Sequence, residues 1–367
     1  MRKLFCVCIL SSLLLFTSCQ SLRQMSIDYL VPSDISFPAQ VRKVGVVNNM
    51  SPEAEIGSNY QILRKDTLPK SLTELSREVT FHHGDAGIAT QSLAESLAEQ
   101  NYFDMVVICD SALRAGDIHP RENILSRQEV IDLAEELGVD ILIALENLVI
   151  KSARAIRVET GFGYVGTVDA QIYPTVTIYI PKRTAPMIRI TPGDTIFWEE
   201  VSYSDMRLRR QMIGDKEMIE EASAYSGGIP IKYLLPHWKT GFRYFYTGGS
   251  PEMRDAYIHI REENWDEAYA LWQSVYEKRK GEKKMHAALN IALYHEMTDD
   301  LEKAKEWAAI AVEMSKKHSK KENITIGEDV RSVNNQILYS QYAIELDNRL
   351  EALSKLNTQM ERFKNDF

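Results

Sequence analysis

Short apolar runs alternate with amphipathic stretches in the first half of the chain. Three β-branched, largely apolar runs predict buried strands at residues 41–47, 103–109 and 139–145. Between them, apolar positions recur at helical spacing over residues 85–100 and 126–137. Alternating buried strands and amphipathic helices favour an α/β layer with some parallel strand pairing.

Local signals mark the ends of the two predicted helices. Asp85 can cap the first helix, and Ser126 opens a capping box with Glu129 at the third helical position. Gly138 follows the second helix and can adopt the left-handed conformation that ends it.

The periodicity then changes to two, which is typical of strands. Residues 171–180, QIYPTVTIYI, and residues 195–201 alternate β-branched and aromatic side chains, and Pro192-Gly193 predicts a turn before the second segment. We expect an antiparallel meander that extends the same sheet. A long polar excursion is expected over residues 51–82, between the first strand and the first helix. Residues 214–226 are predicted to form a helix.

From residue 250 the pattern is helical and repeats 36 residues later, since Asn264–Ala268 aligns with Asp300–Ala304. Small residues recur where paired helices would touch, which resembles the tetratricopeptide repeat. The predicted packing positions are Ala256, Ala268, Trp272, Ala292, Ala304 and Ala311, with His259 and His295 as further helix-packing residues. Residues 337–364 predict one more long helix.

The amino terminus carries a targeting signal. Arg2 and Lys3 precede an apolar run that is too short to span a bilayer. The run ends in Leu-Phe-Thr-Ser-Cys at Cys19, which resembles a bacterial lipobox. This resemblance implies cleavage before Cys19 and acylation of its thiol, so that acyl chains hold the protein at a membrane.

The whole chain resembles an uncharacterised class of envelope lipoproteins of the Bacteroidetes type with a tetratricopeptide-like carboxy terminus. We expect a signal peptide at residues 1–18, a tether at 19–38, a mixed α/β domain at 39–249 and a helical domain at 250–367. No acidic pair follows Cys19, which favours a position that faces the periplasm. We expect the anchor to lie in the outer membrane.

Residues 161–166, GFGYVG, match the glycine pattern of a dinucleotide-binding turn. Such a turn needs a helix directly after it, because the pyrophosphate lies at a helix amino terminus. A strand-like segment containing Pro174 follows instead. We therefore interpret GFGYVG as a hairpin connection.

Other candidate chemistry favours structural roles. We interpret His82-His83 as part of a solvated loop and Cys109 as a buried core residue. Glu199 and Glu200 are expected to point to opposite faces of a strand, so they cannot act as a pair. No G-x-S-x-G, P-loop or HExxH pattern occurs in the sequence. We expect no enzyme activity, no cofactor and no metal site.

Residues 236–246 concentrate aromatic side chains. We interpret Trp238, Phe242, Arg243, Tyr244 and Tyr246 as an interdomain seam or a partner-binding surface, with Arg243 in a structural ion pair. Stacking of a glycan on these rings is the alternative.

The net charge of −9 argues against a duplex nucleic-acid binder, which needs a basic face. The leading hypothesis is a non-enzymatic envelope lipoprotein that binds a protein or peptide through its helical repeats. The second is a glycan-binding lipoprotein that uses residues 238–246.

Overall fold

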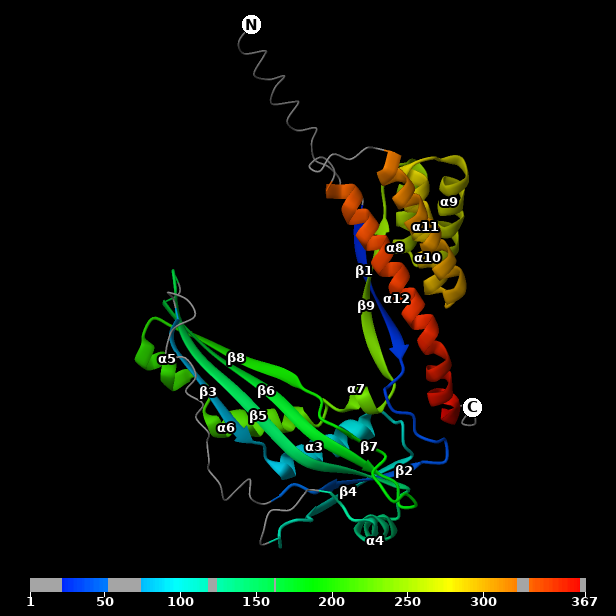
Figure 1. The fold of residues 1–367 in the computed structure, drawn as a ribbon. Helices are drawn as coiled ribbons and strands as arrows, with labels where there is room; N and C mark the ends of the chain where they lie inside the picture. Colours follow the sequence, from blue (N-terminus) through cyan, green and yellow to red (C-terminus); the bar gives the residue numbers. More distant parts are fainter. Residues whose placement is uncertain (1–21, 52–73, 118–123, 162, 322–329, 364–367) are drawn as a thin grey trace. The chain divides into compact units, whose positions relative to one another are not determined.

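The computed structural model describes residues 22–51, 74–117, 124–161, 163–321 and 330–363. These residues divide into two compact units (Figure 1). Among the described residues, the sheet unit extends from Ser33 to His237 and resumes at Gln359, whereas the helical unit comprises Leu22 to Pro32 and Trp238 to Thr358. The predicted fold class, a mixed α/β sheet domain followed by a helical region, is confirmed.

The described part of the sheet unit is built on one seven-stranded sheet. Its strands are β2 (Lys43–Asn48), β3 (Glu74–His83), β4 (Met105–Ala112), β5 (Ile141–Glu159), β6 (Gly163–Tyr179), β7 (Ile188–Ile190) and β8 (Asp194–Ser202). The order is β4-β2-β5-β6-β7, with β3 paired to β5 and β8 paired to β6. Strand β2 pairs in parallel with β4 and β5, and the remaining pairs are antiparallel. Both the parallel layer and the meander are therefore present.

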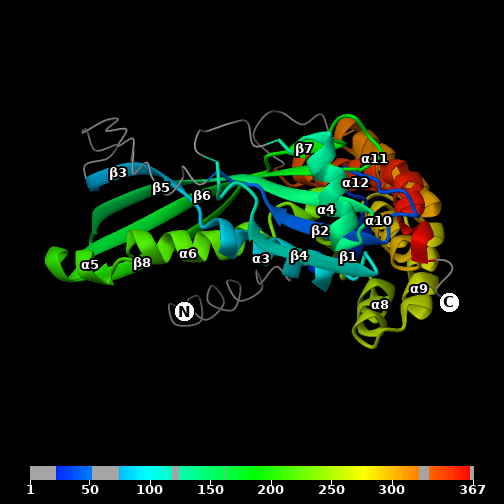
Figure 2. The same cartoon turned by 90° about the horizontal axis from the view of Figure 1, so that it is seen from below.

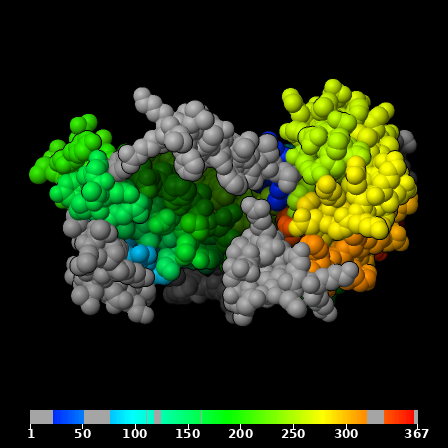
Figure 3. Space-filling view, turned by 90° about the horizontal axis from the view of Figure 1, so that it is seen from above, coloured from blue at the N-terminus to red at the C-terminus, as the bar shows by residue number. Residues whose placement is uncertain are grey.

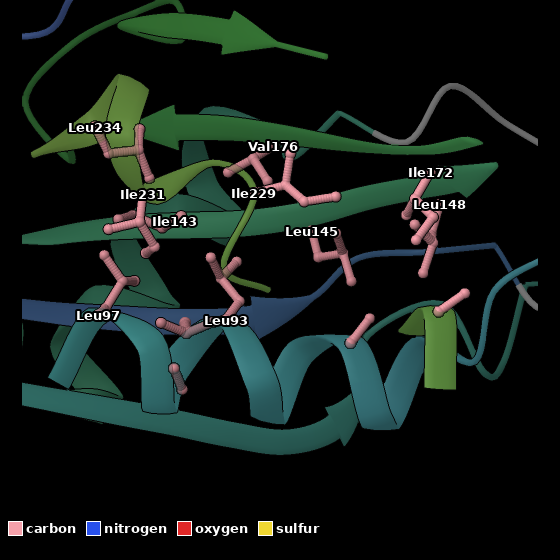
Figure 4. Close-up of a cluster of buried hydrophobic side chains, with 14 of the residues drawn as sticks. Leu93, Leu97, Ile143, Leu145, Leu148, Ile172, Val176, Ile229, Ile231 and Leu234 are labelled. Atoms are coloured by element: carbon pink, nitrogen blue, oxygen red, sulfur yellow. The ribbon is translucent and has the colours of Figure 1, made fainter. Parts of the chain in front are cut away.

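Helices cover both faces of this sheet. They are α3 (Ala86–Glu99), α4 (Arg127–Leu137), α5 (Asp205–Gln211), α6 (Asp215–Ser226) and α7 (Ile231–Leu234). Leu93 and Leu97 on α3 point towards the face of β5 that carries Ile143 and Leu145 (Figure 4). The alternate β5 residues Leu142 and Ala144 belong to the cluster packed by α4. Figure 2 shows α3 and α6 side by side on one face.

The predicted helix-end signals are confirmed. The Asp85 carboxylate accepts the N–H of Ile88 at 2.9 Å, and Ser126 and Glu129 form a complete capping box. Gly138 adopts φ 65°, the left-handed conformation that ends α4.

The helical unit combines a two-stranded sheet with paired helices. It contains β1 (Leu22–Val31), β9 (His237–Tyr246), α8 (Pro251–Arg261), α9 (Trp265–Lys278), α10 (Glu282–Met297), α11 (Leu301–Lys321) and α12 (Val330–Met360), which is followed by a 3-10 turn at Glu361–Phe363. The space-filling view shows α8 to α11 as one continuous surface, coloured from yellow-green to orange (Figure 3).

The turns inside the two helix pairs repeat each other. The N–H of Asn264 donates to the carbonyl of His259 at 2.9 Å, and the N–H of Asp300 donates to that of His295 at 2.8 Å. The residue before each donor has positive φ, 60° at Glu263 and 59° at Asp299. The 36-residue repeat of the sequence is thus a repeat of backbone geometry.

The tether prediction for residues 19–38 is wrong over the part that the structure describes. Residues 22–31 form β1, because Ile27 and Tyr29 alternate inward and the strand bonds to β9. Beyond it, the Ser33 N–H donates to Gln359 Oε1 at 3.1 Å, and Gln359 Nε2 donates to the Ser33 carbonyl at 3.0 Å.

The two units differ from the predicted consecutive domains 39–249 and 250–367, since each unit combines residues from the first part of the chain with residues from the last part.

Candidate binding groove of the helical unit

Strand β9 separates the aromatic run into two sets of side chains. Trp238, Phe242 and Tyr244 are exposed on one face, with 71%, 60% and 37% of their surface accessible. The alternate position Arg243 points inward, because successive strand side chains point to opposite faces. Tyr246, at the end of β9, is also buried, and its ring stacks on His286 at 3.5 Å. The predicted surface therefore retains three aromatics and loses Arg243 and Tyr246 to the interior; its assignment as a seam stays a prediction.

Arg243 makes the ion pair that the sequence predicts. Its guanidinium contacts both carboxylate oxygens of Glu296 on α10 at 2.7 Å. A third contact of 3.0 Å joins Arg243 to Glu345 on α12. Burial alone would lower the pKa of Arg243, but the hydrogen bonds and charges of Glu296 and Glu345 raise it.

Two tyrosines and a second arginine complete this network. The Tyr342 hydroxyl donates to Glu296 at 2.7 Å, and the Tyr29 hydroxyl donates to Glu345 at 2.6 Å. Arg349 also pairs with Glu296, and its guanidinium lies 4.2 Å from the centre of the Tyr29 ring.

Both phenols are held in the neutral form. Burial and the hydrogen bond to Glu345 raise the pKa of Tyr29 to about 12. Burial and the charge of Glu296 raise the pKa of Tyr342 well above its usual value. The two hydroxyls consequently act as fixed donors, and the network joins β1, β9, α10 and α12.

This network forms one wall of a groove of about 970 Å³. The other sides come from β1, from the α10–α11 turn and from the second half of α12. The lining residues are Ser26 to Pro32, Trp238, Glu296 to Glu302, Arg349, Leu350, Ala352, Leu353 and Leu356.

The lining of the groove contains both apolar and acidic side chains. Leu350, Leu353 and Leu356 lie on successive turns of α12 and supply apolar surface, which we call the floor. Asp28, Asp299, Asp300 and Glu302 also line the groove, and we call these carboxylates the rim.

Local contacts fix two of these carboxylates. Asp28 accepts the Thr240 hydroxyl at 2.6 Å, and Asp300 accepts Lys303 Nζ at 2.6 Å. Among the lining residues that the structure describes, Arg349 is the only cation, and it is paired with Glu296. The lining of the groove therefore carries an excess of acidic over basic side chains.

The predicted repeat positions lie inside the helical unit. All six of these side chains are buried: Ala256, Ala268, Trp272, Ala292, Ala304 and Ala311. His295 is buried as well and meets the Tyr269 ring edge-on at 5.5 Å. His259, its counterpart in the first pair, is only half-buried. The five alanines let the helix axes approach, and Trp272 fills the space between helices, so these positions shape the unit that carries the groove.

The GFGYVG segment lies in the β5–β6 hairpin, as predicted. Glu159 pairs with Gly163 across it, and Gly161 and Gly163 have positive φ of 91° and 83°. Strand β6 follows directly, in the place where a phosphate-binding helix would have to begin.

His82 does not lie in a solvated loop. It occupies β3, is buried, and its Nε2 lies 3.0 Å from the Ser152 hydroxyl. The adjacent His83 is exposed on the opposite face of the strand. Cys109 is half-buried against the α4 side of the sheet rather than fully buried. Within the described ranges, no cluster of His, Cys, Asp and Glu could hold a metal ion.

A second polar cluster, which the sequence did not reveal, lies where the parallel pairing of β2 with β5 ends. Buried Arg114 donates to Asn49 at 2.6 Å and pairs with Glu129 at 3.0 Å. Buried Glu146 accepts the Tyr179 hydroxyl and pairs with Arg189 at 3.4 Å. The one sequence signal for this cluster was the acidic residue Glu146, which directly follows the predicted strand at residues 139–145.

Cys19 lies outside the described residues. Of the helices in the described part of the chain, none combines the length and apolar content that a membrane crossing requires.

The fold defines a two-part protein, with a mixed α/β unit and a helical unit that carries the groove. The chain belongs to the family of the domain of unknown function DUF8603, whose model matches residues 41–246. Residues 254–348 match a second family model, the domain of unknown function DUF6340. No curated protein and no solved structure matches the chain.

Proposed function

We propose that this protein is a lipid-anchored envelope protein whose helical unit binds a segment of another envelope protein without catalysis. The observation that carries the proposal is the groove between β1, the α10–α11 turn and α12. Its volume of about 970 Å³ offers room for several side chains of a partner.

The chemistry of the groove favours one kind of occupant. An apolar floor rewards burial of leucine-like side chains, at about 25 cal/mol per Å². The acidic rim favours lysine or arginine beside them. We therefore infer a cationic, amphipathic polypeptide segment as the ligand.

The charged residues of the wall hold structure rather than react. Each contact of Glu296 in the network is to a fixed donor from Arg243, Tyr342 or Arg349. A carboxylate with this many donors is a poor general base, because its lone pairs are already used. This supports a binding role for the groove.

The anchor in this proposal is the acylated thiol of Cys19. Two acyl chains on a glycerol bury enough methylene groups for stable attachment, whereas a single chain holds only marginally. We place the anchor in the outer membrane, facing the periplasm.

Partner capture tests the groove. Purified mature protein should retain one discrete envelope protein, and Leu353→Lys should abolish this capture by placing a cation on the floor. Ile344→Lys is the matched control, because Ile344 is an exposed residue of the same helix that does not line the groove. Equal capture by both variants would remove the groove from the proposal.

The exposed face of β9 favours glycan binding as a second candidate function. Trp238, Phe242 and Tyr244 share that face, and aromatic rings offer flat surfaces for sugar stacking. Calorimetry of the protein against a panel of polysaccharides tests this candidate. Trp238→Ala should remove the binding heat, whereas Phe197→Ala, which changes an exposed aromatic elsewhere, is the control and should keep it. Absence of heat from every glycan would end this candidate.

A further inference from the structure

A basic surface covers one end of the helical unit. It consists of Lys278, Arg279, Lys280, Lys283 and Lys284 around the α9–α10 connection, with Lys316 and Lys317 near the end of α11. We call this surface the basic end. A contact of 3.6 Å between His318 and Glu282 joins its two parts.

Acidic neighbours balance only part of this charge. Glu252 pairs with Arg279 at 2.8 Å, and Glu313 pairs with Lys317 at 2.6 Å. Lys278, Lys280 and Lys283 are exposed, and among the described residues none of them has an ion-pair partner. A locally positive surface therefore persists on a chain whose net charge is −9.

The stability of the helices does not explain all of these cations. Lys283 and Lys284 lie in the first turn of α10, where the helix dipole disfavours positive charge. Acidic residues would stabilise that turn. Glu282 already lies in that turn, and Lys284 Nζ lies 4.2 Å from the centre of the Tyr276 ring, so Lys283 is the cation that helix stability leaves unaccounted for. An exposed cation at this position favours an anionic partner.

The start of β1 lies at this same end of the unit. Leu22 packs against the apolar cluster that contains Tyr246, at the end of β9, and Met285, in the first turn of α10. Figure 1 shows the start of β1, the end of α11 and the start of α12 together at this end.

The proposed anchor would join the chain three residues before Leu22. Only Gln20 and Ser21 separate Cys19 from Leu22. An extended chain covers about 3.3–3.6 Å per residue, so a connection of three residues spans at most about 11 Å. An acyl chain on Cys19 would thus bring this end of the unit against a bilayer.

We propose that the basic end binds the anionic headgroups of the membrane that holds the anchor. The orientation rests on the proposed acylation of Cys19, whereas the lipid contact is a property of the folded helical unit itself. Lysines within a Debye length of an anionic surface are attracted to it. Contact at the basic end would leave the groove, formed by the end of β1 and the α10–α11 turn, directed away from the bilayer.

Vesicle binding tests the contact without the anchor. The full mature chain with Cys19→Ala cannot be acylated, and its partition onto phosphatidylglycerol-containing vesicles is compared with that onto pure phosphatidylcholine vesicles. We expect binding only to the anionic vesicles, and weaker binding as salt is raised. Lys280→Glu with Lys283→Glu should lower the partition at least about tenfold.

The controls separate this proposal from its alternatives. Lys182→Glu with Lys216→Glu makes the same charge change at exposed sites of the sheet unit and should leave partition unchanged. Thermal unfolding should show that the Lys280 and Lys283 variant stays folded, since Glu suits the first turn of α10.

Equal loss in both double variants, equal binding to neutral vesicles, or tighter binding to an oligonucleotide than to anionic vesicles would overturn the lipid contact. Membrane fractionation of the native chain against Cys19→Ala reports on the anchor separately, so the two claims fail independently.

Discussion

Arg243 on β9 and Glu296 on α10 form a buried bidentate ion pair, with both nitrogen–oxygen distances at 2.7 Å. Their side chains are 2% and 1% exposed. Either charge alone would be buried without its main partner, which is strongly unfavourable. The pair therefore fixes the strand that carries the exposed aromatic face against the helix that leads into the groove.

Removal of either partner should destabilise the helical unit. Arg243→Ala or Glu296→Ala is expected to lower the free energy of unfolding by about 3–5 kcal/mol, measured by chemical denaturation. Lys305→Ala is the control, because its 2.5 Å pair with Asp347 is exposed and should contribute about 0–1 kcal/mol. Similar losses in all three variants would contradict the role of burial.

Gly227 should not tolerate a methyl group. A Cβ there would lie 2.3 Å from the backbone nitrogen of Leu93, where α6 ends against α3. Gly227→Ala is expected to lower the free energy of unfolding by about 1–3 kcal/mol. At the adjacent Gly228 a Cβ meets no atom closer than 3.8 Å, so Gly228→Ala should be nearly neutral. Equal thermal stability of the two variants would sink this prediction.

His286 should make the stability of the helical unit depend on pH. Burial, with a smaller contribution from the charge of His318, lowers its pKa to about 4. Between about pH 6.5 and pH 4 the unfolded chain binds a proton that the folded chain does not, so stability falls as pH falls through this window. The full difference corresponds to about 3 kcal/mol.

The variant His286→Phe isolates this effect, because it preserves the ring stacked on Tyr246 and cannot titrate. Its unfolding free energy, measured by denaturant titration at several pH values, should change less over the same window. An identical pH profile in both proteins would show that His286 does not carry the dependence.

Cys19→Ala should release the protein from the membrane fraction. Acyl chains supply about 0.8 kcal/mol per buried methylene, and their loss removes the anchor. Mass spectrometry of the mature chain should show the lipid mass on Cys19 in the native protein and none in the variant. Unchanged fractionation would contradict the anchor.

Local sequence signals predicted elements whose stability is local. Asp85, Ser126 with Glu129, and Gly138 act within one helical turn, so their roles followed from neighbouring residues. The hairpin at GFGYVG followed from the absence of a helix after it. The 36-residue repeat aligned Asn264 with Asp300, whereas the positive φ of the residue before each, Glu263 and Asp299, became visible only in the structure.

Features that depend on distant partners were not predictable. Strand β1 forms because β9, about two hundred residues away, covers one of its edges, so its segment alone resembled a tether. The sequence predicted an ion pair for Arg243, but its partners Glu296 and Glu345 come from two other helices. His82 looked solvated because its burial depends on pairing of β3 with β5. The groove itself arises from segments at both ends of the chain.

Site-specific photo-cross-linking in the intact envelope tests the central claim most directly. A photoreactive residue at position 353, on the floor of the groove, should yield one discrete protein adduct, and the same residue at position 344 should yield none. Neutralising the rim with Asp299→Asn and Glu302→Gln should reduce the adduct from position 353, since the expected partner is cationic. No adduct from position 353, or the same adduct from position 344, would contradict binding of a partner polypeptide in the groove.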